Sequence, residues 1–201
     1  MPINSITFEF LLLQISVAFS PGLIIALVVN ESVQRNKISG IKVAIGAAFG
    51  CLIITILSAI LVSSLFSKIP TILTLIYLGG TIYIIFKGFK TFNTNSADLL
   101  SNSSENLILS GFKLNLSNPK MWVFYLTVLP IFVFDKEKIF TELIYLGLIT
   151  VLINLFADVS YAISSNYFFK DASLKTKTLI NKLSGITLIS IGIYLFFTRF
   201  V

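Results

Sequence analysis

The stretch Lys113–Phe134, KLNLSNPKMWVFYLTVLPIFVF, places the strongest constraint on how this chain can fold. Its apolar part, Met121–Phe134, covers about 21 Å as a helix, which is less than the roughly 30 Å of a bilayer's hydrocarbon core. A helix that crosses a membrane here must therefore include the amides, Pro119 and Lys120 that precede Met121. Such groups are tolerated within a bilayer where they are buried in protein or line a watery cavity. The stretch predicts a broken membrane helix at a binding site.

The composition is that of a membrane protein. The chain is 56% hydrophobic and 12% charged, whereas soluble domains are about 45–50% apolar and about 25% charged. Its 201 residues can hold six spans of about 20 residues each. The net charge of +6 does not indicate nucleic-acid binding, because the basic residues are scattered among apolar segments. We expect an all-α, polytopic protein that forms a single domain over residues 1–201 in a lipid bilayer.

Six spans are expected, with a polar loop in the middle. Residues 93–106, NTNSADLLSNSSEN, lack hydrophobic periodicity and form this loop. It separates half-repeats of about 1–92 and 107–201, and three spans in each half predict two inverted repeats. The expected spans are Ile6–Asn30, Val43–Phe66, Ile69–Phe86, Leu114–Phe134, Leu143–Phe169 and Leu183–Thr198.

The charges of the loops predict the orientation. With six spans, most of the 15 lysines and arginines fall on one side, which the positive-inside rule makes cytoplasmic. Both termini then face outside. The N-terminus has no basic region before its apolar run and no cleavage signal, so we expect the first span to be retained.

Asp158 is the only carboxylate deep inside an expected span. Asn154, Tyr161 and Ser165 share its helical face, which we expect to point into the helix bundle. Burial makes a carboxylate hold its proton more firmly, so that a central acid can exchange protons near neutral pH. We interpret Asp158 as a proton-coupling residue; the alternative is a protonated acid that hydrogen-bonds a neighbouring helix.

The first span contains a break of its own. Pro21 removes the helical partner of the Val17 carbonyl, and Gly22 permits a close approach. A break here presents carbonyls that can bind an ammonium group and half-helix N–H groups that can bind a carboxylate. These are the two ends of an amino acid. A simple proline kink is the alternative, and the polar residues on nearby turns that favour a site are Gln14, Ser16 and Ser20.

Other residues have structural interpretations. Gly46 and Gly50 form a GxxxG pattern, which predicts close helix packing within one chain or across a homodimer. Trp122 and Tyr125 are expected to face lipid or the membrane interface. The chain has one cysteine and no histidine, which excludes a Cys/His metal site and argues against metal or thiol export.

Several strings resemble the LysE/RhtB family of amino-acid exporters, in the family's order. They are FSPGLIIALV from Phe19, the glycines at 40, 46 and 50, NLSNPKMWVFYLTVLP from Asn115, and GITLISIGIYLF from Gly185. The Pro-Gly of the first helix and the Asn-Pro-Lys of the fourth are the specific matches. The family commonly has a second proline where this chain has Leu23.

The resemblance implies a six-helix exporter in the bacterial inner membrane for threonine, homoserine, lysine or other neutral and basic amino acids. It implies no enzyme activity and no cofactor. We expect the substrate to bind Pro21, Gly22, Asn115, Asn118, Pro119, Lys120, Asn154 and Tyr161, with Asp158 coupling protons. A non-transporting scaffold and an exporter of another solute remain alternatives; an intramembrane aspartyl protease would need a second deep carboxylate.

Overall fold

The computed structural model describes residues 7–20, 22–68 and 106–168, with isolated helical positions between 78 and 93 and between 182 and 197. Within these residues the chain is all-helical, as expected. The elements are α1 Phe8–Phe19, α2 Leu23–Gln34, α3 Lys37–Lys68, α5 Leu107–Leu116, α6 Pro119–Val123, the π-helical turn η2 Phe124–Val128, the 3-10 turns η3 Leu129–Phe132 and η4 Lys136–Lys138, and α7 Ile139–Phe168.

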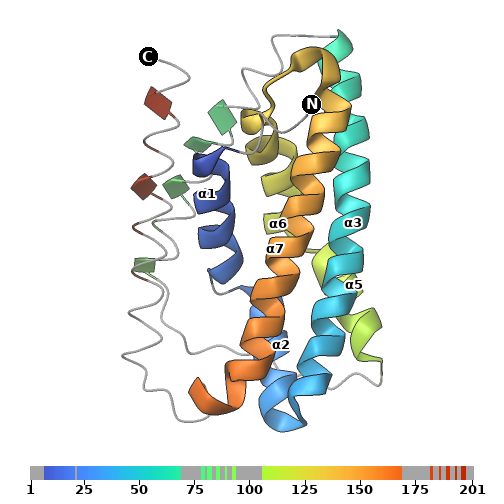
Figure 1. The fold of residues 1–201 in the computed structure, drawn as a ribbon, viewed down its shortest axis with the longest axis vertical. Coiled ribbons are helices and arrows are strands. Elements are labelled where there is room, and N and C mark those ends of the chain that lie inside the picture. The colour runs from blue at the N-terminus through green and yellow to red at the C-terminus, as the bar shows by residue number, and fades with distance from the viewer. Residues whose placement is uncertain are drawn as a thin grey trace.

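Two long helices, α3 and α7, run side by side along the bundle (Figure 1). Lys37–Leu65 of α3 and Lys136–Ser165, which runs from η4 into α7, are long and apolar enough to cross a membrane. Helices α1 and α2 qualify as a third span if the pair, bent by 49° at their junction, is one broken span. The second expected span lies within α3, and the fifth follows α7 as far as Phe168, beyond which the chain is outside the described residues. The third and sixth fall mainly outside the described residues, as does the polar loop.

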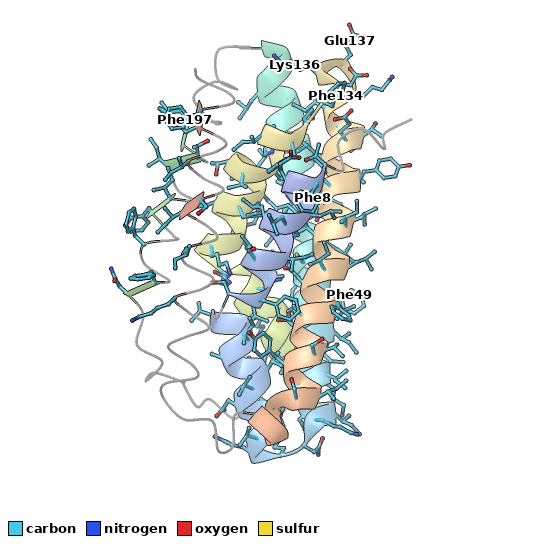
Figure 2. All side chains as sticks on the ribbon, turned by 60° about the vertical axis from the view of Figure 1, so that its left-hand side comes forward. Phe8, Phe49, Phe134, Lys136, Glu137 and Phe197 are labelled. Atoms are coloured by element: carbon cyan, nitrogen blue, oxygen red, sulfur yellow. The ribbon has the colours of Figure 1, made fainter. Side chains whose placement is uncertain are left out.

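The outer surface of the bundle is apolar. Phe49 of α3 and Phe156 of α7 expose 54% and 68% of their surface, and Figure 2 shows Phe8 and Phe49 pointing outward along the bundle's flank. Lys136 and Glu137 lie at one end of the bundle in the same view. A belt of large apolar side chains with charges at the end is the surface that a bilayer requires.

Glycines bring α3 and α5 into backbone contact. A Cβ added at Gly46 would lie 1.9 Å from the Ile108 carbonyl oxygen, and one added at Gly111 would lie 2.1 Å from the Val43 carbonyl oxygen. Side chains therefore do not fit at either position. The GxxxG pattern serves packing within the chain, as one of the two structural interpretations predicted.

The fourth expected span differs from its prediction. It was placed at Leu114–Phe134, but α5 begins at Leu107 and ends at Leu116, and a new helix starts at Pro119. The Asn118 side chain causes the break by accepting from the Lys120 N–H at 3.1 Å, while Pro119 is placed at the first helical position, where it needs no N–H. The Asn118 N–H donates to the Asn115 carbonyl at 3.1 Å, so this carbonyl is not left open.

The connection between η3 and α7 is fixed by a buried acid. The Glu142 carboxylate, in the first turn of α7, accepts from the backbone N–H groups of Phe134 at 2.6 Å and Asp135 at 3.1 Å. These bonds satisfy the backbone where the chain leaves the helix. They also set where α7 starts, and hence how its polar face is aligned with α1.

Candidate functional site

A cavity lies where α1, α2, α3, α5, α6 and α7 meet. Its volume is about 50 Å³, enough for a few water molecules. Its wall combines polar and small residues with larger apolar ones. The polar and small residues are Gln14, Ala18, Ser20, Gly22, Ala47, Ala48, Cys51, Asn115, Asn118, Lys120, Asn154 and Asp158, and the larger apolar ones are Val17, Leu23, Ile24, Ile25, Met121, Phe124 and Leu155. The cavity is therefore a chamber in which charged and amide groups meet beside apolar surface.

Two side chains bind the carbonyls at the end of α1. The Lys120 ammonium donates to the Val17 carbonyl at 3.3 Å, which the Ser20 N–H also approaches at 3.3 Å. The Tyr161 hydroxyl donates to the Phe19 carbonyl at 2.9 Å. The last carbonyls of a helix carry partial negative charge, so a lysine here is favourably placed. The break thus presents carbonyls to an ammonium group, and in this structure the ammonium group is that of Lys120.

The other half of the break begins α2. Gly22 is the residue that precedes its first turn and offers no side chain to the open N–H groups there. Gly22, Leu23 and Ile24 line the cavity. The positive end of the α2 dipole therefore meets the chamber, which suits a carboxylate group. A Cβ on Gly22 would lie 3.7 Å from the Lys120 ammonium, which places both features together.

One acid and one base share the chamber. Asp158 is 7% exposed, and with Lys120 it lines the cavity. The two opposite charges interact electrostatically. Among the described residues the Asp158 carboxylate has no hydrogen-bond donor. A buried charge that faces a cavity in this way is available to a ligand.

A chain of hydrogen bonds runs from the cavity into the core. The Gln14 amide donates to Asn154 Oδ1 at 3.0 Å, and the Asn154 amide approaches Cys51 Sγ at 3.8 Å. The Cys51 thiol lies 3.1 Å from the Tyr125 hydroxyl, which donates to the Gly147 carbonyl at 3.3 Å. This series of hydrogen bonds links α1, α3, η2 and α7 to one another.

Three buried polar atoms at the cavity wall have no partner within the described part of the chain. They are Gln14 Oε1, Ser20 Oγ and Asn115 Oδ1. The Asn115 amide is held in place because its nitrogen donates to the Ala47 carbonyl at 2.6 Å. Buried polar groups are nearly always hydrogen-bonded, so these three atoms are suited to hydrogen-bond a ligand that enters the chamber.

The structure brings most of the predicted site residues together. Those that line the cavity are Gly22, Asn115, Asn118, Lys120, Asn154 and Asp158. Tyr161 binds the end of α1, and Ser165 is buried on the same face. Pro119 contributes the first helical position of α6, and Pro21 lies outside the described residues. Ser16 bonds to the carbonyl of Leu12 in its own helix.

Two residues of this hydrogen-bond series, Tyr125 and Cys51, were not predicted from the sequence as part of the site. Tyr125 was expected to face lipid or the interface, but it is fully buried, so that prediction was wrong. Cys51 was considered only as a metal or redox group. It directly follows Gly50 on α3, and the close packing predicted for that glycine was the available signal that its neighbour faces the interior.

The sequence is similar to those of known membrane proteins. The family of LysE type translocators matches residues 15–199. An uncharacterised membrane protein of Bacillus subtilis, YrhP, is 25% identical over 190 residues, covering 86% of this chain and 90% of the relative. A cysteine/O-acetylserine efflux protein of Salmonella typhimurium is 24% identical over 151 residues, covering 75% and 77%. No solved structure matches the chain.

The match extends over most of the chain, which therefore belongs to the LysE type translocator family. It is a multi-pass membrane protein of a family of transporters rather than enzymes. The sequence resemblance to this family is confirmed.

Proposed function

We propose that this chain is a secondary exporter of an amino acid or a close derivative across the bacterial cytoplasmic (inner) membrane. The observation that supports the proposal is a chamber that holds one lysine and one aspartate between the two ends of a broken helix. These groups are complementary to the carboxylate and ammonium of a zwitterion. A related efflux protein in Salmonella typhimurium is named for cysteine and O-acetylserine, which agrees with an amino-acid substrate.

The carboxylate of the substrate would bind the Lys120 ammonium, the Asn118 amide and the open N–H groups of α2. The Asn115 amide nitrogen already donates to the Ala47 carbonyl, so Asn115 would offer its oxygen to a donor of the substrate. The substrate ammonium would bind Asp158 and the α1 carbonyls. Because Lys120 now donates to the Val17 carbonyl, a substrate ammonium would replace Lys120 there while the lysine turns to the substrate's carboxylate. Binding would thus exchange one ammonium contact for another and leave no carbonyl open.

Asp158 would couple transport to protons. Protonation from the outside would weaken its contact with the substrate ammonium and favour release. Each pH unit of gradient supplies about 1.4 kcal/mol, and 100 mV supplies about 2.3 kcal/mol per charge moved. Either source is sufficient for a concentration ratio of tens. Export can therefore be driven by the proton gradient or by the membrane potential.

The proposed topology has six spans in two inverted repeats of about 1–92 and 107–201, with both termini outside. In this orientation both breaks, at Ser20–Gly22 and at Asn118–Lys120, lie in the cytoplasmic half of the membrane. The substrate would enter from the cytoplasm between them. The bilayer and the substrate are the partners that this mechanism needs; it does not require a homodimer.

Efflux from cells tests the proposal. Cells are loaded with a mixture of dipeptides, and all released amino acids are read at once for wild type, Asp158→Asn, Pro119→Ala and an empty vector. Asp135→Asn, in an exposed turn, is the matched acid control. We expect faster release of one or a few amino acids, lost in the first two variants and retained in the control. Folded protein that releases nothing faster than the empty vector would favour a scaffold or another solute.

A further inference from the structure

We propose that Tyr125 is the residue that closes the outer half of the transport route, and that this half continues from the chamber between α3 and α7. The inference rests on the proposed export route, but not on the identity of the substrate. Three observations carry it. The polar faces of α3 and α7 extend beyond the chamber, the Tyr125 hydroxyl bridges the two helices there, and a second partner for this hydroxyl lies unpaired beside it.

The helical faces that line the chamber on α3 and α7 continue past it. Cys51 lines the cavity, and Thr55 follows one turn later on the same face of α3. Asn154 lines the cavity, and Thr150 precedes it by one turn on the same face of α7. The two threonines are 2% and 0% exposed. Because the two helices run in opposite directions (Figure 1), both faces lead toward the end of the bundle at which α7 begins.

This part of the route is closed in the structure. The wall of the cavity includes Cys51 and Asn154 but neither of the two threonines. The helices touch at this level, because a Cβ added at Gly147 would lie 2.3 Å from Thr55 Cγ2. In the proposed topology the closed end is the one that faces outside. A substrate in the chamber therefore needs α3 and α7 to separate here before it can leave.

The Tyr125 hydroxyl holds the two helices together at this point. It donates to the Gly147 carbonyl of α7 at 3.3 Å and lies 3.1 Å from the Cys51 thiol of α3. Within a regular helix the Gly147 carbonyl also accepts from a backbone N–H one turn later. The tyrosine can therefore leave without exposing an unpaired carbonyl. Tyr125 also lies on the π-helical turn Phe124–Val128, and such turns occur frequently at functional sites.

A second partner for the tyrosine hydroxyl is already in place. Thr150 Oγ1 is buried and has no hydrogen bond within the described part of the chain, and its side chain lies beside the Tyr125 hydroxyl. A buried hydroxyl that loses its partner is costly, so a gate needs an acceptor in each of its two positions. Bonded to Thr150, the hydroxyl leaves both the Gly147 carbonyl and the Cys51 thiol. The contact between α3 and α7 is then no longer bridged.

Labelling of a chamber thiol from each side of the membrane tests the gate. A chain with Cys51→Ser and Ala18→Cys carries its only thiol in the chamber wall, and a membrane-impermeant thiol reagent is added to right-side-out and to inverted vesicles. Adding Tyr125→Phe should raise labelling from the outside about twofold to tenfold, the equivalent of one hydrogen bond, without raising it from the cytoplasmic side. Tyr145→Phe, at a tyrosine of α7 that is 45% exposed, is the matched control and should change neither rate.

Thr150 provides a second and independent variant. Thr150→Val keeps the shape but removes the second partner, so that labelling from the outside and export should both fall about twofold to tenfold. Its melting temperature should not fall, since the lost oxygen is unpaired in the closed state. Thr150→Ser should keep the labelling and export rates of wild type. A purely structural hydroxyl would not produce this combination of equal stability and slower opening.

The outcomes separate the gate from the proposed function. Tyr125→Phe that speeds labelling equally from both sides indicates a loosened bundle and would overturn the inference, as would Thr150→Val with unchanged labelling and export. If Tyr125→Phe does not fold, Thr150→Val decides. Expected labelling in a protein that exports no amino acid would leave the gate standing and reject the proposed substrate. Amino-acid export with labelling that no variant changes would reject the gate alone.

Discussion

Lys120 Nζ lies 3.3 Å from the carbonyl oxygen of Val17, a residue 103 positions earlier in the chain. Lys120 stands at the second position of α6, where the dipole of its own helix disfavours a cation. The C-terminal end of α1 faces Lys120, and its partial negative charge favours a cation. The lysine therefore joins the two helix breaks into one site.

Replacing Lys120 tests this connection. Lys120→Met should lower the free energy of unfolding by about 1.5–3 kcal/mol, the usual contribution of a hydrogen bond to a charged group, and should abolish export. Lys120→Arg should recover stability more than transport, because the planar guanidinium differs in shape. Thermal unfolding in detergent and efflux would be measured together, with Lys113→Met on the exposed side of α5 as control. A Lys120→Met protein that is as stable as wild type would contradict the link to Val17.

Asp158→Asn should separate folding from coupling. The amide has nearly the same shape but carries no titrating proton, so the protein should fold as well as wild type. Its export should fall at least about tenfold, and any remaining rate should not respond to external pH. Efflux measured from pH 5 to 8 at constant membrane potential would show this. Residual export of Asp158→Asn that keeps the wild-type pH profile would remove Asp158 from proton coupling.

Much of this site can be predicted from local rules. A proline followed by glycine, and an Asn-Pro pair, mark the two breaks because the backbone chemistry of proline is local. The face of α7 that carries Asp158 follows from helical periodicity alone. Local rules do not identify which side chain binds each exposed backbone group. The sequence predicted that an ammonium would meet the Val17 carbonyl, but not that Lys120 supplies it in this structure.

The burial of Tyr125 could not be predicted from the sequence. A tyrosine in an apolar membrane segment suits the interface as well as the interior. Its burial depends on the π-helical turn Phe124–Val128, which changes the register of the helix, and on Cys51, 74 residues away. Both are set by packing. The start of α5 at Leu107 escaped prediction for a similar reason: its glycine contact with α3 is not visible in one segment alone.

Gly46→Ala should be the most destabilising glycine substitution in α3. The added Cβ would lie 1.9 Å from the Ile108 carbonyl oxygen, so that two backbones must move apart. Overpacking of this kind costs about 1–3 kcal/mol or more. Gly79→Ala is the matched control, because no atom of the described residues lies within 4 Å of a Cβ added there. Melting temperatures of the two variants in the same detergent would be compared, and equal values would refute the close contact of α3 and α5.

Asp135 provides a pH-dependent test in the turn outside the spans. Its hydrogen bond with Lys138, helped by the backbone N–H of Glu137, holds the pKa of the Asp135 carboxyl below its usual value. Because the folded pKa is lowered, this contribution to stability is present above the unfolded pKa of about 3.9 and is lost as the pH falls through the folded pKa. Asp135→Asn should therefore melt slightly below wild type at pH 7. The difference should disappear in acid, and a difference that grows in acid would contradict this sign.

Cys51 is the only cysteine of the chain and a built-in reporter of the chamber. It is 1% exposed and lines the cavity, so a small thiol reagent should reach it only when the chamber opens. A saturating concentration of the exported amino acid should slow this labelling severalfold, because substrate and reagent would share the same space. A chain with Cys51→Ser and Ile53→Cys carries its thiol on the outer face of α3, where Ile53 is 40% exposed. Labelling there should not respond to the amino acid. If the amino acid is transported at its maximal rate and Cys51 labelling is unchanged, the substrate does not pass through this chamber.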